Sequence, residues 1–405
     1  MKILFCEGSS LSAREALTAL GPQKHSIIIC DPDPKCLCRF TKFKVKYYRC
    51  PSINQDLEGY YRRIVEIIQL EKVDVLLPVH EQALLFAKRL PELSKIVRID
   101  LPEFNSYLKL FSKIRFIQLL DKLKLPHPRT ILCDNPEAVH SQIFYPCFLK
   151  AEFGTASSSV WQIENEADLG GALEGAPSSN AAGASRYLIQ EYASGRLEVA
   201  HALFNRGKLI SFHCCRRIRE GARGSSSSKI GVERPALREH FKLIGRELGW
   251  HGPLALDYFY DETDQKPYYI DASPRLVEPM NTRINGINQP EQLLLLSRKK
   301  VGAIPAGATK GLQSHMLMMS LLDTAGSGKR LDLIRDLMAA LQSKGVYFGS
   351  AEELTNPAFD WRSLIPLGVV ILRLLIDPKK AEQIAGAAVH NYALSHETIA
   401  RILAL

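Results

Sequence analysis

The chain has 405 residues, of which 46% are hydrophobic and 23% are charged. These proportions are ordinary for a soluble globular protein and exclude a disordered chain, a collagen-like fibre and a small disulfide-stabilised protein. At about 150 residues per domain, the length predicts two or three domains. The net charge of +9 suits nucleic acid, an anionic membrane face or a phosphate-bearing small molecule, so its distribution must decide between them.

Nine cysteines are an odd number, and their spacing suits neither a disulfide framework nor a zinc site, so we expect reduced thiols. The apolar run from Leu364 ends at Arg373, which is short of the roughly 18 residues that a membrane span needs. The N-terminal apolar stretch meets Glu7 too early for a secretory signal. We expect a cytoplasmic protein with no membrane span.

The first hundred residues alternate predicted strands and helices, which is typical of a parallel sheet. We predict strands over 3–5, 26–30 and 73–78 and helices over 12–20, 57–70 and 81–90. The first strand runs into Gly8-Ser9-Ser10, but this is not the glycine spacing of a dinucleotide-binding loop. Residues 1–103 are therefore expected to form a Rossmann-like domain that does not bind a dinucleotide.

The segment Lys35–Arg49 carries six basic side chains and no acidic one, with aromatic residues between them. It is the best nucleic-acid-binding candidate in the chain. We favour a lysine-guarded edge strand, because lysines at 42, 44 and 46 alternate with apolar residues at 43, 45 and 47. Binding of nucleic acid is not expected.

After residue 103 we predict a helix over 113–123 and a strand over 144–151 that leads into a loop rich in glycine and serine. Two further segments rich in these residues predict a flexible connection over 170–185 and a mobile loop over 216–228. The remaining predicted strands cover 187–192, 197–205, 208–215, 254–260 and 267–272; the remaining helices cover 235–249 and most of the chain from 290 onward.

Several of these residues suit a nucleoside triphosphate held by magnesium. Asp257 and Asp271 lie on strands predicted to pair, so their carboxylates can converge on a hard cation whose shell phosphates complete. Arg275 adds a permanent cation beside them. Lys150 leads into the loop, whose N–H groups can cover phosphates.

Other side chains in this region suit the base and the sugar. Gln190-Glu191-Tyr192 ends an apolar strand, where the backbone can read an adenine edge, and Glu198 can reach ribose hydroxyls. Each residue also has a structural interpretation: the two glutamates can be strand-edge charges, and Asp271 can form a salt bridge with Arg275. The order of the elements favours the nucleotide site.

In this order and spacing the residues resemble the ATP-grasp superfamily, which includes D-alanine ligase, biotin carboxylase and the large chain of carbamoyl phosphate synthetase. The resemblance covers residues 113–288 and implies an α/β ATP-grasp fold. It implies phosphate-binding lysines, a lid over 153–160, an adenine hinge, a ribose acid, metal ligands and a catalytic pair. The lysines are Lys113 and Lys150, the lid includes Gly154, Ser157 and Ser158, and the hinge is Gln190, Glu191 and Tyr192. The ribose acid is Glu198, the metal ligands are Asp257, Asp271 and Ser273, and the catalytic pair is Arg275 with Lys150.

The segment Asp271–Arg275 is similar to the family's E-x-N-P-R run, but Asp replaces Glu and Ser273 replaces Asn. These changes shorten one metal ligand and weaken another, which puts a second metal position in doubt. The segment Glu278–Arg283 offers a competing N-x-R register. We prefer Asp271–Arg275, because it follows directly from an apolar strand that can hold the ligands rigidly.

The resemblance implies an ATP-dependent ligase that activates a carboxylate as an acyl phosphate for an amine, with Mg²⁺, or Mn²⁺ in its place, and with release of ADP and phosphate. We expect Arg217, Arg219, Arg223 and Glu278 to bind the substrates. The alternatives are carboxylase- or kinase-like chemistry, or a non-catalytic nucleic-acid-binding protein that uses Lys35–Arg49. We expect the catalytic region over 104–289 and a mostly helical extension over 290–405, a packing layer or the interface of a homodimer.

Overall fold

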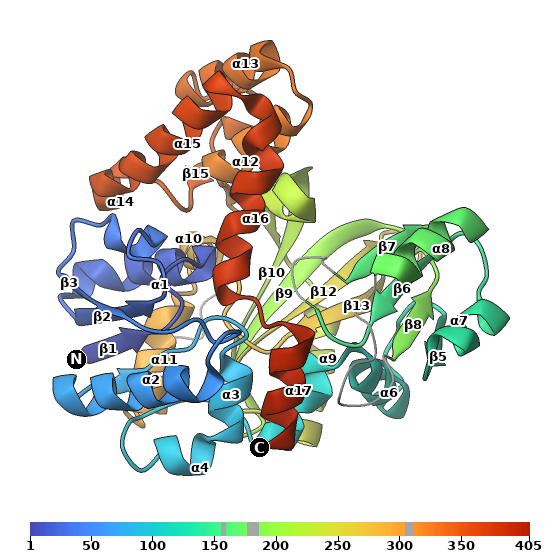
Figure 1. Ribbon diagram of the computed structural model, residues 1–405, viewed down its shortest axis with the longest axis horizontal. Helices are drawn as coiled ribbons and strands as arrows, with labels where there is room; N and C mark the ends of the chain where they lie inside the picture. The colour runs from blue at the N-terminus through green and yellow to red at the C-terminus, as the bar shows by residue number, and fades with distance from the viewer. Residues whose placement is uncertain (155–158, 176–185, 304–310) are drawn as a thin grey trace.

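The computed structural model describes residues 1–154, 159–175, 186–303 and 311–405. Within these ranges the chain forms three β-sheets with helices around them (Figure 1). The N-terminal sheet and a small sheet lie on opposite sides of the view, and a large sheet runs between them. The described residues include no helix that is both long and apolar enough to cross a membrane.

The N-terminal sheet has four parallel strands in the order β3-β2-β1-β4, as the alternating pattern predicts. Its strands are β1 (Lys2–Phe5), β2 (Ser26–Asp31), β3 (Val45–Arg49) and β4 (Val75–Leu76). Its helices are α1 (Leu11–Leu20), α2 (Leu57–Glu71), α3 (Ala83–Lys88) and α4 (Leu90–Leu93). Ser10 caps α1 by accepting the N–H of Ala13, so this helix begins directly after the glycine–serine turn.

The prediction of an edge strand is confirmed for this sheet. β3 lies at its edge, and Lys42, Lys44 and Lys46 are exposed while the residues between them are half-buried, as expected of an edge strand. In the turn after β1, the N–H and the hydroxyl of Ser9 both donate to the Asp31 carboxylate, at 2.8 and 3.0 Å. This turn therefore already holds an anionic group, which disfavours a dinucleotide phosphate there.

The small sheet has the order β5-β8-β6-β7 and is antiparallel throughout. Helices α5 (Phe104–Phe111) and α6 (Lys113–Leu123) precede it. Its own elements are β5 (Thr130–Cys133), α7 (Pro136–Gln142), β6 (Cys147–Ala151), β7 (Val160–Ile163), α8 (Glu166–Gly175) and β8 (Tyr187–Gln190). Leu149, Ile163 and Ile189 form its core with residues of α7 and α8.

The large sheet has seven strands in the order β13-β12-β9-β10-β11-β14-β15. They are β9 (Arg196–Asn205), β10 (Lys208–Glu220), β11 (Ser226–Val232), β12 (Gly252–Asp261), β13 (Lys266–Ser273), β14 (Gln313–His315) and β15 (Ala351–Glu352). The turn between β9 and β10 places Gly207 at a φ of 83°, a conformation that favours glycine. Helix α9 (Pro235–Leu248) covers the sheet with Phe241, which packs edge-on against Phe212.

The prediction of a mobile loop over 216–228 is wrong. β10 continues to Glu220, a short helical turn η3 covers Ala222–Gly224, and β11 begins at Ser226. The serine run is a buried strand, because its hydroxyls find backbone partners: Ser227 Oγ donates to Glu220 O, and Ser228 Oγ to Ser314 O. The charged and glycine residues that suggested a loop therefore belong to a hairpin with a tight end.

The chain after residue 273 is mostly helical, and this includes the helical region predicted from residue 290 onward. Its helices are α10 (Pro279–Ile284), α11 (Gln289–Ser297), α12 (Leu317–Gly326), α13 (Arg330–Leu341), α14 (Pro357–Asp360), α15 (Leu364–Ile376), α16 (Ala381–Tyr392) and α17 (His396–Ala404). The division at 289/290 stays a prediction, and contacts cross it. α11 packs its leucines against the N-terminal sheet, β14 pairs with β11, and α17 contacts α3.

Candidate functional site

A cavity of about 430 Å³ lies between the small sheet and the large sheet. Its walls are apolar, with Phe148 and Val160 from the small sheet and Leu197 and Phe259 from the large one. Polar side chains gather along the rest of its lining: Lys150, Gln190, Glu191, Arg217, Lys229, Asp257, Asp271 and Glu278. All of these except Lys229 were predicted from the sequence, so seven predicted polar residues meet in one place.

Two lysines approach the cavity from different elements. Lys150 is buried on β6, and its Nζ donates to Gln190 Oε1 at 2.7 Å and to Ile270 O at 3.3 Å. Burial lowers the pKa of Lys150 to about 8. Lys113 begins α6, which Ser112 caps, and its Nζ lies 3.0 Å from Gly154 O and 3.6 Å from Asp271 Oδ2.

Asp257 on β12 is directly opposite Asp271 on β13 in the antiparallel register. Directly opposite side chains share a face, and their Cβ atoms are about 5 Å apart. Burial first, and then the charge of Asp271, raise the pKa of Asp257 to about 7. Two converging carboxylates fit a hard divalent cation such as Mg²⁺, which would relieve their repulsion. Ser273, two residues beyond Asp271, lies on the same face of β13.

Each of the two candidate registers brings one carboxylate to the cavity: Asp271 of the preferred one and Glu278 of the competing one line it, whereas Ser273 and Arg275 do not. Asn281 is buried on α10, where its Oδ1 is 2.8 Å from His213 Nε2 and its Nδ2 donates to Ser314 Oγ. Arg283 lies over the ring of Phe359. Neither residue lines the cavity. Arg275 follows β13, where its Nη1 donates to Leu276 O at 3.2 Å, and its charge acts to lower the pKa of Asp257 against the larger effects of burial and Asp271.

The strand end at residues 190–192 borders the cavity through its first two side chains. Gln190 connects three strands of the small sheet, because it accepts from Lys150 of β6 and donates to Thr130 Oγ1 of β5 at 3.0 Å. Glu191 accepts the N–H of Arg129 at 2.9 Å. The hydroxyl of Tyr192 instead donates to Glu164 and does not line the cavity.

The prediction that Glu198 reaches a ribose is wrong. Its neighbours Leu197 and Val199 line the cavity, so strand alternation turns Glu198 to the opposite face. There it is buried, and its carboxylate pairs with Arg234 at 2.6 and 2.9 Å and accepts the hydroxyl of Tyr258 at 2.8 Å. Glu198 is part of the core under the sheet.

The predicted substrate-binding residues divide. Arg217 and Glu278 line the cavity. Arg219 does not, because its guanidinium pairs with Asp336 of α13 at 2.8 Å, and that prediction is wrong. The side chain of Arg223 lies outside the described part of the chain, as do Ser157 and Ser158 of the predicted lid.

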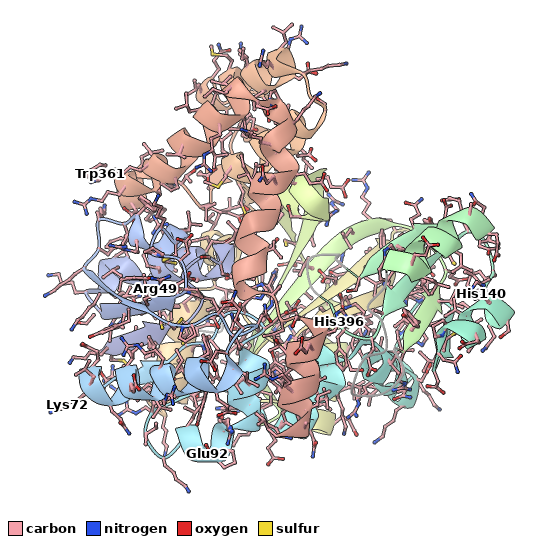
Figure 2. The ribbon with its side chains drawn as sticks, in the orientation of Figure 1. Arg49, Lys72, Glu92, His140, Trp361 and His396 are labelled. Atoms are coloured by element: carbon pink, nitrogen blue, oxygen red, sulfur yellow. The ribbon has the colours of Figure 1, made fainter. Side chains whose placement is uncertain are left out.

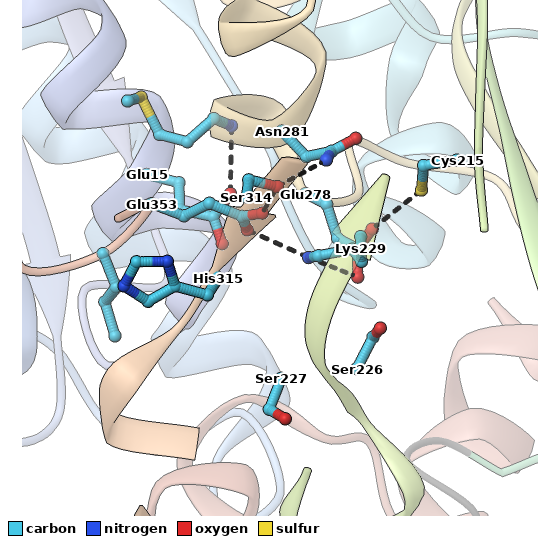
Figure 3. A network of polar contacts seen from close by, with 12 residues as sticks. Glu15, Cys215, Ser226, Ser227, Lys229, Glu278, Asn281, Ser314, His315 and Glu353 are labelled. Carbon is cyan, nitrogen blue, oxygen red and sulfur yellow. Dashed lines mark hydrogen bonds and ion pairs between the residues drawn. The ribbon is translucent and has the colours of Figure 1, made fainter. Parts of the chain in front are cut away.

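A buried ionic network beside the cavity was missed by the sequence reasoning. Figure 3 shows Lys229 of β11 between Glu278 and Glu353, and its Nζ is 2.9 Å from both carboxylates. Burial works to lower the pKa of Lys229, but the two carboxylates outweigh it and raise that pKa. The backbone of Glu278 has a φ of 46°, in the left-handed region that side chains rarely adopt. This strained residue links the network to the cavity.

A second set of ligand-type side chains lies close to Glu278. His201, His213 and Cys215 have donor atoms within 4.8 Å of one another, and all three are buried. Burial lowers the pKa of both histidines to about 3, so their rings are neutral. Imidazole and thiol donors suit zinc and softer ions better than Mg²⁺, so the two aspartates are the better candidates for magnesium.

The backbone at the start of the predicted lid is held by the C-terminal helix. His396 of α17, labelled near the centre of Figure 2, places its Nε2 3.1 Å from Phe153 O. The next carbonyl along the chain, that of Gly154, accepts from Lys113. The backbone that leads toward the predicted lid is therefore held from both sides.

Neither a protein-family model nor a curated protein sequence matches this chain. Solved structures do match. The biotin carboxylase–beta-gamma-ATP complex from Campylobacter jejuni is 16% identical, covers 73% of this chain and 70% of its own, and has a TM-score of 0.58.

Two synthetases of known structure are similar to this chain to the same extent. N5-carboxyaminoimidazole ribonucleotide synthetase from Thermus thermophilus is 19% identical over 77% of this chain and 81% of its own, with a TM-score of 0.54. N5-carboxyaminoimidazole synthetase from Staphylococcus aureus, complexed with ADP, is 16% identical over 78% and 79%, with a TM-score of 0.56. This chain therefore has the ATP-grasp fold, with a Rossmann-like sheet before it and helices after it.

Proposed function

We propose that this protein is an ATP-dependent ligase that joins a carboxylate to an amine through an acyl phosphate and releases ADP and phosphate. The observation that carries the proposal is the convergence of buried Lys150 with the facing aspartates Asp257 and Asp271 in one cavity. A fold shared with a carboxylase and synthetases that bind adenine nucleotides supports the same chemistry.

The charges of the cavity suit phosphoryl transfer. A carboxylate oxygen of the first substrate attacks the γ-phosphorus of ATP, and the bond from that phosphorus to ADP breaks. The amine nitrogen then attacks the acyl carbon. The bond between that carbon and the phosphate oxygen breaks, phosphate leaves, and the nitrogen loses one proton. Lys113, Lys150 and Arg275 place positive charge where the phosphoryl oxygens become more negative. Bound Mg²⁺, or Mn²⁺ in its place, would neutralise phosphate oxygens from the side of Asp257, Asp271 and Ser273.

The apolar walls suit the base. Phe148 and Val160 of the small sheet and Leu197 and Phe259 of the large sheet bound a slot whose polar edge is formed by Gln190 and Glu191. We assign adenine to this slot, with the strand end at 190–192 as its hinge. The substrates enter from the side of Arg217 and Glu278.

The test measures release of ADP and phosphate with Mg²⁺ across a panel of carboxylates paired with amines. Lys150→Ala, Asp271→Ala and Arg275→Ala should each lower turnover at least about a hundredfold, because each removes charge that faces the transferred group. Lys122→Ala, which removes an exposed lysine far from the cavity, is the matched control. Equal turnover in all five proteins would refute the proposal.

The same assay separates the alternatives. Phosphate release that requires bicarbonate would favour carboxylase-like chemistry, and a phosphorylated product without amine would favour kinase-like chemistry. Oligonucleotide binding that falls steeply with salt and survives Asp271→Ala would favour a nucleic-acid-binding protein.

Homodimer formation is also part of the proposal. Helices α13 and α15 expose apolar side chains that a second copy of the chain can cover. Light scattering in solution tests whether the protein forms a dimer.

A further inference from the structure

A second cavity, of about 420 Å³, lies between the N-terminal domain and the C-terminal helices. The N-terminal domain contributes Leu11 and Phe40, α12 contributes Met318 and Leu322, and α15 and α16 contribute Val370 and Ile384. These apolar side chains make up most of its lining. The charged residues in that lining are Asp33, which is half-buried, and Lys35, which is exposed, so charge is confined to the mouth.

This second cavity adjoins the nucleotide cavity. Gly224 and Ser225, at the tight end of the β10–β11 hairpin, line both. On the nucleotide side, Arg217 donates to Gly224 O at 2.7 Å. One molecule can therefore lie across the hairpin end, with a polar group near Arg217 and the rest of its body among the helices.

A polar group also marks the inner wall of the second cavity. The ring of Tyr392, which lines the cavity, lies 4.1 Å from the ring of His80. His80 is buried, and its Nδ1 has no hydrogen-bond partner among the described residues. Arg275 is near enough to affect the ionisation of His80. His80 lies behind Tyr392 and lines neither cavity, so the wall at Tyr392 is backed by a buried polar ring.

The size and lining of the cavity select its occupant. Small-molecule sites are typically about 300 to 1,000 Å³, mostly apolar, with a few polar groups that fix orientation. Moving an alkyl or aryl group from water into such a lining is favourable in proportion to the apolar area buried. The two neighbouring methionines at 318 and 319 have flexible side chains that adapt to different apolar shapes.

We propose that the second cavity binds the apolar body of one of the joined substrates, a carboxylic acid or an amine that carries an alkyl or aryl group. The inference rests on the proposed ligase function and adds the substrate class to it. A small polar acid or amine would leave this cavity unfilled and is excluded as the preferred substrate.

The test uses the full-length chain with MgADP and four probes: 4-phenylbutyrate and 4-phenylbutylamine, with acetate and methylamine as their polar counterparts. Ligand-observed NMR and calorimetry should detect binding of a phenyl-bearing probe and not of its counterpart. Ala385→Phe, which fills the cavity from α16, should weaken that binding at least about tenfold and leave MgADP affinity unchanged. Ala340→Phe on α13, whose alanine does not line the cavity, is the matched control.

A second variant keeps the test decisive if Ala385→Phe does not fold. Val370→Thr nearly keeps the shape of the side chain and replaces one methyl group of the apolar lining with a hydroxyl, so it should also weaken binding of the phenyl-bearing probe. Equal binding of acetate and 4-phenylbutyrate would overturn the proposal. So would unchanged binding of the phenyl-bearing probe in both variants. Binding of phenyl probes by a chain that binds no MgADP would refute the ligase function instead, so the two failures are distinguishable.

Discussion

Asp257 is the residue whose ionisation controls the proposed metal site. Burial and the facing charge of Asp271 raise its pKa to about 7. A proton and a divalent cation compete for the same oxygens, so Mg²⁺ affinity should fall about tenfold per pH unit below 7 and level off above it. Calorimetric titration of the chain with MgCl₂ at about pH 6, 7 and 8 measures this dependence.

The same ionisation sets a sign for stability in the metal-free protein. Between about pH 4 and 7, Asp257 holds a proton in the folded chain and not in the unfolded chain, so the free energy of unfolding falls as the pH rises. Asp257→Asn should lose this contribution and be more stable than wild type at about pH 8. An identical pH slope of stability in the two proteins, measured by denaturant unfolding, would contradict the assignment.

Glu198 supports the fold and not the nucleotide. Its carboxylate pairs with Arg234 under the large sheet, so Glu198→Ala leaves a nearly buried guanidinium without its main partner. The free energy of unfolding should fall by about 3 kcal/mol, while MgADP affinity in the folded fraction stays unchanged. Urea unfolding and calorimetry measure the two effects separately. A large loss of MgADP affinity without loss of stability would restore Glu198 to the site.

Single residues also show what the sequence allows one to predict. Lys150, Asp257 and Asp271 could be predicted as residues of one site because local spacing places each at a strand end or on a hairpin. Glu198 was misassigned because a strand shifted by one residue exposes the opposite face. Lys229 was missed because its partner Glu353 lies 124 residues away, and only the folded sheet brings them together.

At the scale of elements, the β10–β11 hairpin was the hardest to predict. Arginine, glycine and serine resemble a solvated loop in sequence, yet β14 pairs with β11 and lets the serines satisfy backbone carbonyls in the interior. Alternating strands and helices at the N-terminus were predictable, because their periodicity is local. Pairing with a strand more than eighty residues later is not a local property.

The hairpin offers a matched pair of variants on one strand. Arg217 lines the nucleotide cavity, whereas Arg219 pairs with Asp336 of α13. Arg217→Ala should lower turnover about tenfold or more with little change in stability. Arg219→Ala should lower the free energy of unfolding by about 1 to 2 kcal/mol and leave turnover of the folded protein unchanged. Steady-state kinetics and urea unfolding on both variants check this; the reverse pattern would exchange the two roles.

At the scale of the whole molecule, the C-terminal part of the chain packs back against the N-terminal domain. α11 covers the N-terminal sheet, and α17 lies beside α3, so the N-terminal and C-terminal parts are one packed body (Figure 1). Sequence patterns predicted helices here but not their partners, since an amphipathic face does not specify which apolar surface it meets. This packing places C-terminal residues in the lining of the second cavity and His396 beside Phe153.

His396 is the point where the C-terminal helix contacts the backbone that leads into the predicted lid. Burial lowers its pKa, so at neutral pH the ring is uncharged and its Nε2–H donates to Phe153 O. His396→Ala removes a hydrogen bond worth about 1 kcal/mol, so MgADP affinity should fall about fivefold, and amide exchange at residues 151–154 should become faster. His396→Gln, which retains an N–H donor, should recover most of the affinity. Faster exchange without loss of affinity would show that this backbone does not contact the nucleotide, whereas unchanged exchange would show that α17 does not hold it.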